Sequence, residues 1–215
     1  DNSLGTGCPW IWSTGYMLHN QTAQEIVVLV DDANNVLGTA PKATVHTDST
    51  LLHRAFSCFC FRRDGKLLTQ RRALHKITWP GMWANSVCGH PALNESNECA
   101  VYRRMRHELG ITTAAKMSCM APDFRYRAEL DGIVENELCP VFVAIIDQDA
   151  TPNPQEVDAC AWTTWGEFVY LCRHVLGAYA PWTILEVEAL LANPEFIRML
   201  ATLGVDAHSE VPPSA

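Results

Sequence analysis

The segment at residues 86–110, SVCGHPALNESNECAVYRRMRHELG, constrains the fold more than any other part of the chain. From residue 95 to residue 109 its pattern is helical, because charged residues cover the faces away from an apolar row, Val101, Met105 and Leu109. Gly110 follows, and helices commonly end at a glycine. The segment therefore predicts a loop that leads into one amphipathic helix.

Strand-like runs lie on both sides of this helix. Residues 25–31 form a short apolar run, and residues 53–72 indicate a hairpin around the turn dipeptide Asp64-Gly65. Residues 133–146, IVENELCPVFVAII, alternate at their start and are continuously apolar at their end. We interpret this run as one buried strand that begins with acidic residues.

Two further helices are expected at residues 162–176 and 181–193, the second with Pro181 in the first turn, where proline is accepted. Strands come first and helices interrupt them, so we expect an α/β fold, a mixed sandwich whose mixed sheet is flanked by helices. A chain of 215 residues is long enough for one such core. We expect a single domain at 25–203, a variable or poorly ordered extension at 1–24 and a frayed tail at 204–215.

Charge and cysteine content exclude several classes of protein. The formal net charge of −8 argues against a nucleic-acid-binding face, which needs a surplus of basic residues. No apolar stretch approaches the ~20 residues of a membrane span, and the opening residues lack the pattern of a signal peptide. Nine cysteines, an odd number, are scattered along the chain, which favours reduced thiols in a cytoplasmic protein.

Two acids in the VENE run point to a cation or a shared proton. Side chains alternate across a strand, so Glu135 and Glu137 share one face. Adjacent carboxylates repel unless a proton or a cation lies between them. The alternative is a solvated edge strand with two surface glutamates.

Three histidines are candidates to join these acids. His46 and His53 are seven residues apart, and His90 follows Cys88 at the same-face spacing of a strand. Imidazole and carboxylate together bind zinc, manganese or iron. Each histidine alone is more often an ordinary surface or core residue, so the sequence leaves both interpretations open.

The segment at residues 86–110 also resembles the Nudix box, a diphosphate-handling motif. The resemblance is carried by the spacing of Gly89, Glu95, Arg103, Glu108 and Gly110. Arg104 and His107 stand where that motif has glutamates. The resemblance implies that Glu108 holds one magnesium ion and that diphosphate is bound, with the power to hydrolyse it in question.

Further motifs extend the resemblance to most of the chain, from about residue 25 to about residue 193. They are the histidine pair with six residues between its members (His46-x6-His53), the segments RRALHKITWPGMWANSVCGHP and FRYRAELDGIVENE, and the dipeptide Pro181-Trp182. The chain resembles the type 1 isopentenyl-diphosphate isomerases of the bacterial kind, within the Nudix superfamily. This resemblance implies a Nudix-like fold and the reversible conversion of isopentenyl diphosphate to dimethylallyl diphosphate, in isoprenoid precursor biosynthesis.

The resemblance also implies roles for individual residues. Cys88 and Glu137 match the acid/base pair that moves the two protons, and Tyr126 matches the tyrosine that assists the glutamate. Trp182 matches the tryptophan whose ring stabilises a carbocation. The metal ligands it implies for zinc or manganese are His46, His53, His90, Glu135 and Glu137.

A magnesium ion is implied at Glu108, together with the backbone carbonyl of Cys88, as a bridge to the diphosphate. The implied diphosphate-binding residues are Lys42, Arg72, Lys76 and Arg104, which without the resemblance would count as surface charges. The implied partner is a small molecule alone, with no nucleic acid and no membrane, and the protein is expected to be a monomer. Two other functions stay open at this point, a Nudix-type diphosphate hydrolase and a diphosphate-binding module without catalysis.

Overall fold

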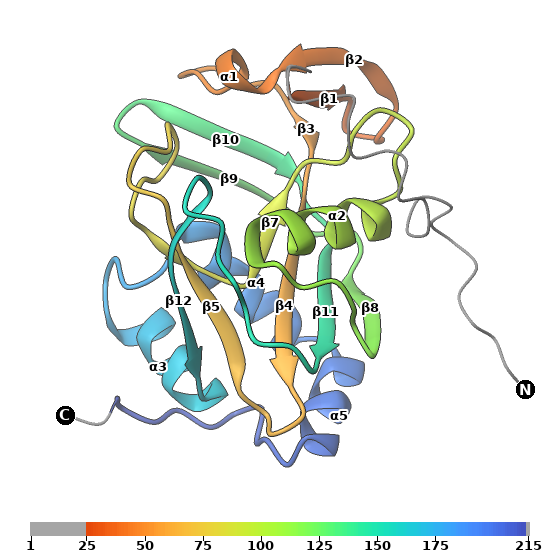
Figure 1. Ribbon diagram of the computed structural model, residues 1–215. Helices are drawn as coiled ribbons and strands as arrows, with labels where there is room; N and C mark the ends of the chain where they lie inside the picture. The colour runs from red at the N-terminus through yellow and green to blue at the C-terminus, as the bar shows by residue number, and fades with distance from the viewer. Residues whose placement is uncertain (1–24, 214–215) are drawn as a thin grey trace, which may run out of the picture.

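The computed structural model describes residues 25–213 and has two β-sheets, with most of its helices packed against the larger one (Figure 1). The extension expected at residues 1–24 lies outside the described residues. The larger sheet has seven strands, and its main path runs β12-β5-β4-β11-β8. These strands are Val157–Thr163, Leu67–Arg72, Phe56–Arg62, Val141–Ile146 and Lys116–Ala121 in that order.

Two short strands complete the larger sheet. Strand β6 (Trp83–Ala84) pairs with β5, and β7 (Val87–Gly89) pairs with β4. The hairpin expected at residues 53–72 is present, since β4 and β5 are antiparallel around the turn at Gly65. The pairing of β7 places Cys88 directly opposite Ser57.

Helices cover both faces of the larger sheet, which makes its central strands fully buried (Figure 1). On β4, Phe59 and Phe61 face the core shared with the C-terminal helices, whereas Phe56 and Cys58 face the core shared with the helix of the opening motif. Alternate side chains of a strand point to opposite faces, so a continuously apolar run is what a strand between two helical layers requires.

The helix of the opening motif, α2 (Asn97–Leu109), confirms the sequence prediction. Ser96 caps its first turn, and Val101, Met105 and Leu109 are fully buried. Gly110 ends it in the left-handed conformation at φ 66°, with its N–H donating to the carbonyl of Arg106.

The C-terminal helices are α3 (Trp165–His174), α4 (Pro181–Leu191) and α5 (Pro194–Thr202). Helix α3 begins at Trp165, later than expected, because β12 runs to Thr163 and Thr164 forms a capping box with Glu167. Pro181 occupies the first turn of α4 as expected. Helix α5 was not expected, although Asn193 caps it and Pro194 opens it.

The smaller sheet has five strands in the order β2-β1-β3-β10-β9. Their bounds are Val36–Pro41, Ile26–Val30, His53–Arg54, Ile133–Leu138 and Arg125–Leu130, and the short helix α1 (Lys42–Val45) follows β2. The interpretation of residues 133–146 as one strand is wrong. The run divides at Cys139-Pro140, because proline has no N–H for the ladder, and β10 and β11 join different sheets.

The tail is not frayed in its described part, which corrects the expectation for residues 204–215. The indole Nε1 of Trp165 donates to the carbonyl of Ala207 at 2.8 Å, and Val211 N–H donates to the carbonyl of Gly166 at 3.1 Å. Ala207 is 4% exposed. The segment therefore covers α3, and a buried indole hydrogen bond holds it there.

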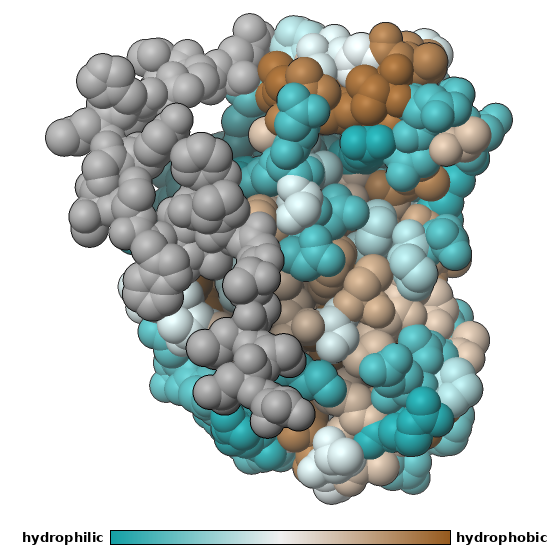
Figure 2. Space-filling view, turned by 90° about the vertical axis from the view of Figure 1, so that its right-hand side faces the viewer, coloured by the Kyte–Doolittle hydropathy of each residue, from teal (hydrophilic) through white to brown (hydrophobic). Residues whose placement is uncertain are grey.

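Apolar side chains are exposed at the edge of the smaller sheet. Figure 2 shows them gathered at the upper end of one face, where β1 and β2 lie in Figure 1. The exposed residues on these strands are Ile26, Val36 and Leu37. Among the described residues, no helix is both long and apolar enough to span a membrane, and the free thiols are Cys58, Cys60, Cys88, Cys119, Cys139, Cys160 and Cys172.

Gly110→Ala is expected to lower the free energy of unfolding by more than Gly204→Ala. Both glycines follow a helix at positive φ, which costs a residue with a Cβ about 1 to 2 kcal/mol. A Cβ at Gly110 would also meet Thr151 at 3.2 Å, whereas at Gly204 it meets nothing within 4 Å. Urea unfolding of both variants measures the difference, and equal losses would contradict the tight contact with Thr151.

Candidate functional site

A cavity of about 350 Å³ lies where the two sheets, α2 and α4 meet. Every residue expected in the site lines it except His53, which is fully buried behind Glu137. The volume falls in the ~300 to 1,000 Å³ range of small-molecule sites. One cavity therefore brings together residues from Glu25 to Trp182, across most of the described chain.

Three histidines and one glutamate converge at one end of this cavity. One ligand atom from each of His46, His53, His90 and Glu137 lies within 4.8 Å of the others. His90 Nε2 lies 3.1 Å and His53 Nε2 lies 3.4 Å from Glu137 Oε1. The buried Nε2 atoms of His46 and His53 have no hydrogen-bond partner, as expected of nitrogens directed at a metal ion.

Strand pairing explains this convergence. Glu137 of β10 is paired with His53 of β3 on one side and with Tyr126 of β9 on the other. His90 follows β7 directly, and His46 is the residue at which α1 ends. His53 Nδ1 lies 2.9 Å from the carbonyl of Leu51, which orients its ring and leaves Nε2 toward the cluster.

Burial and neighbouring charges set the protonation of these groups. Burial, reinforced by the other histidines, lowers the pKa of His46 to about 4, and burial likewise lowers the pKa of His90 to about 4. Burial alone would raise the pKa of Glu137, but the neighbouring imidazoles of His53 and His90 outweigh it and leave that pKa well below its ordinary value. Neutral imidazoles and an ionised carboxylate are the forms that bind a divalent cation.

Glu135 lies beside the four converging residues but is not one of them. Tyr126 Oη lies 2.8 Å from Glu135 Oε2 and 2.8 Å from Glu137 Oε2. Burial, followed by the repulsion of Glu137, raises the pKa of Glu135 to about 7. A proton on Glu135 is therefore separated from Glu137 by a single hydroxyl group.

Cys88 lies across the cavity, at the middle of β7. Its thiol donates to Asn85 Oδ1 at 3.0 Å, and its sulfur lies 3.3 Å from Ser57 Oγ. Burial, together with the buried carboxyl of Glu186, raises the pKa of this thiol well above its ordinary value. The thiol thus holds its proton, unlike a nucleophilic cysteine with a depressed pKa.

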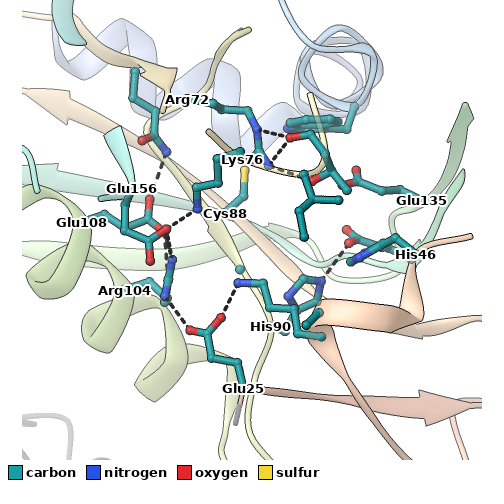
Figure 3. Close-up of a pocket in the computed structure, with 18 of the residues that line it drawn as sticks. Glu25, His46, Arg72, Lys76, Cys88, His90, Arg104, Glu108, Glu135 and Glu156 are labelled. Carbon is teal, nitrogen blue, oxygen red and sulfur yellow. Dashed lines mark hydrogen bonds and ion pairs between the residues drawn. The ribbon is translucent and has the colours of Figure 1, made fainter. Parts of the chain in front are cut away.

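The basic residues at the other end of the cavity are paired with acids (Figure 3). Lys42 Nζ lies 2.6 Å from Glu25, and Lys76 forms an ion pair with Glu156. Arg104 is 4% exposed and lies 2.5 Å from Glu108, 3.2 Å from Glu25 and 3.1 Å from Glu156. Burial raises the pKa of Glu156, but Arg104 and Lys76 outweigh it and lower that pKa to about 2.

Arg72 differs from the other basic residues because it has no carboxylate among its hydrogen-bond partners. Its guanidinium donates to the carbonyls of Thr78 and Trp79, and it lies 5.4 Å from the centre of the Trp182 ring. Trp182 is 2% exposed and contacts Tyr126 with ring centres 6.1 Å apart. The floor of the cavity is therefore aromatic and can accommodate a cation.

Glu108 is buried on α2 and lines the cavity beside the basic group. One of its oxygens accepts from Arg104 and the other accepts from Gln70 Nε2 at 3.2 Å. A buried carboxylate beside basic residues suits magnesium, which takes one or two acids and completes its shell with phosphate oxygens and water.

Several residues of the site were missed from the sequence. Glu25 and Glu156 line the cavity as partners of the basic residues, and Gln70 contacts Glu108. The only signal for the acids was the excess of 24 acidic over 16 basic residues, which leaves acids available as partners for basic residues. Asn85, Ser57 and Glu186 had no sequence signal, because each comes from a different element behind Cys88.

Comparison with known proteins identifies relatives of this chain. The NUDIX domain model matches residues 51–181. The isopentenyl-diphosphate Delta-isomerase of Clavibacter sepedonicus is 47% identical over 77% of this chain and 87% of that relative. The isomerase of the same name from Paenarthrobacter aurescens is 48% identical over 79% of this chain and 92% of that relative.

The fold of this chain is also similar to that of a solved structure. The crystal structure of DR0079 from Deinococcus radiodurans aligns with a TM-score of 0.61, covering 77% of this chain and 99% of that one. The two chains are 19% identical, so the similarity concerns the fold alone.

The histidine and glutamate cluster is expected to bind one zinc or manganese ion per chain. His90→Ala should weaken this affinity by more than about 100-fold, since even the loss of an outer hydrogen-bond partner costs about 10 to 100-fold. His75→Ala is the matched control, because His75 lines the same cavity but stands outside the cluster. Equilibrium dialysis measures the affinities, and equal values for both variants would contradict the site.

Proposed function

Since the chain belongs to the isopentenyl-diphosphate Delta-isomerases and carries their NUDIX fold, we propose that Cys88 and Glu137 move the two protons that convert isopentenyl diphosphate to dimethylallyl diphosphate. The observation that carries this proposal is the position of the two groups. Cys88 belongs to the larger sheet and Glu137 to the smaller one, and both line one cavity. A substrate between them would present opposite faces to the two groups.

The reaction requires two such groups. An isolated alkene is a poor base, so an acid must deliver a proton to its terminal carbon. A base must then remove a proton from the carbon nearer the diphosphate. Glu137 is the acid in this assignment, and the proton that it delivers would reach it from Glu135 through the hydroxyl group of Tyr126. Cys88 is the base in the same direction and the acid in reverse.

The intermediate is a tertiary carbocation, which water would trap as an alcohol. Trp182 and Tyr126 form an apolar wall beside Cys88. An aromatic face stabilises a cation by about 0.5 to 2 kcal/mol, and the buried wall excludes water from the reacting carbons. The Arg72 guanidinium, which lies over the Trp182 ring with its carbon 5.4 Å from the ring centre, would face the diphosphate in this proposal.

The ion expected among the histidines is zinc or manganese, with Glu135 as a further ligand in the proposed set. When bound, it would polarise the Glu137 carboxyl group and make it a stronger proton donor. His46, His53 and His90 would hold the cation, while the Tyr126 hydroxyl group lies within hydrogen-bond distance of both Glu135 and Glu137.

The diphosphate is assigned to the basic end of the cavity. Lys42, Arg72, Lys76 and Arg104 would contact its oxygens, and Glu108 with the carbonyl of Cys88 would hold magnesium between protein and substrate. Glu25 and Glu156 now satisfy these basic groups, so substrate oxygens would replace those carboxylates as partners. Binding would thereby exchange one set of charge pairs for another at the same cations.

We extend the proposal to the cellular setting on the same grounds. The protein acts as a cytoplasmic monomer on a small molecule, without nucleic acid or membrane, and supplies precursors for isoprenoid synthesis. The net charge of −8 supports the absence of a nucleic-acid partner, and the seven free thiols found among the described residues are consistent with a reducing compartment.

Cys88→Ala and Glu137→Gln should each lower kcat by at least about 100-fold, since loss of a general acid or base costs about 10² to 10⁴-fold. The matched controls are Cys160→Ala and Glu129→Gln, which alter a thiol and a carboxylate that do not line the cavity. Dimethylallyl diphosphate is quantified by chromatography. Release of free phosphate by the wild-type protein would indicate a hydrolase, and binding without turnover would indicate a binding module.

A further inference from the structure

The turn between β5 and β6 closes on Arg72, a residue assigned above to the diphosphate. Arg72 ends β5, its N–H donates to the carbonyl of Met82 at 2.9 Å, and its carbonyl accepts from Gly81 N–H at 3.2 Å. The chain between these contacts therefore returns to the residue from which it left. Within this turn, Thr78 and Trp79 contact the Arg72 guanidinium.

Thr78 and Trp79 provide three neutral oxygen atoms to this guanidinium. Arg72 Nε donates to the carbonyl of Thr78 at 3.2 Å and to the carbonyl of Trp79 at 3.1 Å. Arg72 Nη2 donates to the same Thr78 carbonyl at 2.8 Å and to Thr78 Oγ1 at 2.9 Å (Figure 3). A guanidinium has five N–H donors, and these contacts use the three on Nε and Nη2. The two on Nη1 make no hydrogen bond with any residue that the structure describes.

The backbone of Trp79 is held in a conformation that few bulky residues adopt. Its φ angle is 44°, in the left-handed region, where a residue with a Cβ is disfavoured. Successive carbonyls of an extended chain point to opposite sides, whereas the carbonyls of Thr78 and Trp79 both reach Nε of Arg72. The unfavourable conformation thus brings two carbonyl groups to one guanidinium.

The indole ring of Trp79 anchors the turn in the aromatic wall of the cavity. Trp79 is 2% exposed, and its ring meets that of Trp182 edge-on, with ring centres 5.4 Å apart and planes at 85°. The Arg72 guanidinium lies 5.4 Å from the centre of the same Trp182 ring. Edge-on aromatic pairs and a cation over a ring are both attractive, so the two tryptophans and the arginine hold one another in place.

The neutral character of these partners matters for anion binding. Lys42, Lys76 and Arg104 each form an ion pair with a carboxylate, with which a diphosphate has to compete. Of the four basic residues assigned to the diphosphate, only Arg72 forms no ion pair with a residue in the described part of the chain. Carbonyl and hydroxyl oxygens orient its guanidinium without cancelling the positive charge.

We propose that Thr78 and Trp79 are positioning residues, which hold the Arg72 guanidinium by neutral oxygens and thereby present its Nη1 end and its full charge to the diphosphate. The inference rests on the proposed assignment of Arg72 to the diphosphate. No bond forms or breaks in this arrangement, and no proton moves. Because Arg72 is oriented before the ligand arrives, less side-chain freedom is lost on binding.

Thr78→Val removes one acceptor from Arg72 at nearly constant size, whereas Thr78→Ser keeps it. With magnesium present, Thr78→Val should weaken the binding of inorganic diphosphate by about three- to tenfold, since the Thr78 carbonyl still accepts from the same nitrogen. Thr78→Ser should bind within about twofold of the wild type. Isothermal titration calorimetry measures these affinities. Thr163→Val is the control, because Thr163 is also partly buried but does not line the cavity.

In the isomerisation assay, Thr78→Val should raise KM by the same factor and leave kcat unchanged, because Arg72 contacts the diphosphate in the ground state and in the transition state alike. A fall in kcat at unchanged KM would contradict a role in holding the diphosphate.

A double-mutant cycle with Arg72→Lys tests whether Thr78 acts through Arg72. Lysine keeps a positive charge but lacks the planar fork that both fills the turn and reaches the ligand. Thr78→Val should therefore have no further effect on diphosphate affinity in the Arg72→Lys protein. An equal loss in both backgrounds would show that Thr78 acts independently of Arg72, and the inference would be wrong. Wild-type affinity in Thr78→Val would also overturn it.

Two substitutions of Trp79 test the anchor. Trp79→Phe keeps an aromatic ring against Trp182, so diphosphate affinity should stay within about threefold of the wild type. Trp79→Ala removes the ring, and affinity should fall at least as far as in Thr78→Val. Thermal unfolding shows that each variant is folded, and the Thr78 variants test the inference without disturbing the buried ring. Wild-type affinity in folded Trp79→Ala would refute the anchoring role.

The same measurements separate this inference from the proposed function. If Arg72→Lys binds inorganic diphosphate as tightly as the wild type, the assignment of Arg72 to the diphosphate fails. If Arg72→Lys weakens binding while Thr78→Val and Trp79→Ala do not, that assignment stands and the positioning role is refuted.

Discussion

The site depends on a carboxylate that is almost completely buried. Glu137 is 5% exposed, and a charge at such a depth is sustained only by partners that offset its loss of hydration. Its neighbours are His53 and His90 on one oxygen and Tyr126 on the other. The same contacts that stabilise the charge create the pocket for a cation, because they hold three imidazoles around one carboxylate. The residues that stabilise the buried charge of Glu137 are therefore the same residues that form the candidate cation site.

The two sheets explain why the proposed acid and base face each other. Glu137 lies on β10 of the smaller sheet, and the chain then turns at Pro140 and enters the larger sheet as β11. Strand β11 runs parallel to β4, and β4 pairs with β7, which carries Cys88. The position of the thiol relative to the carboxylate is therefore fixed by hydrogen-bonded strands rather than by flexible loops, as a proton-transfer site requires.

The two ends of the cavity differ in how they manage charge. At the histidine end, the neutral imidazoles of His46 and His90 lie beside one anion, which leaves a place for a cation. At the other end, Lys42, Lys76 and Arg104 already have carboxylate partners, so the free protein is electrostatically satisfied without an anionic ligand. This pairing explains how an acidic protein can keep a buried arginine such as Arg104 at the proposed diphosphate site.

The sequence was informative where local pattern determines structure. Helix α2, its end at Gly110 and the hairpin around Gly65 follow from periodicity and turn chemistry, and the motifs around Cys88 and Glu137 identified the cavity-lining residues. It failed where tertiary context decides. The division at Pro140 depends on which sheet each half joins, and the docking of the tail depends on a carbonyl accepting from Trp165. The acid partners of the basic residues likewise come from elements distant in the chain.

The most direct test of this account is proton NMR of isopentenyl diphosphate incubated with the protein, magnesium and zinc or manganese in D2O. Transfer of solvent deuterium to the terminal carbon and loss of hydrogen from the carbon next to the diphosphate are both predicted. At equilibrium, deuterium should then be found at both carbons, because the reaction is reversible. Dimethylallyl diphosphate without solvent deuterium at the methyl carbon would contradict proton delivery across the cavity and the roles assigned to Glu137 and Cys88.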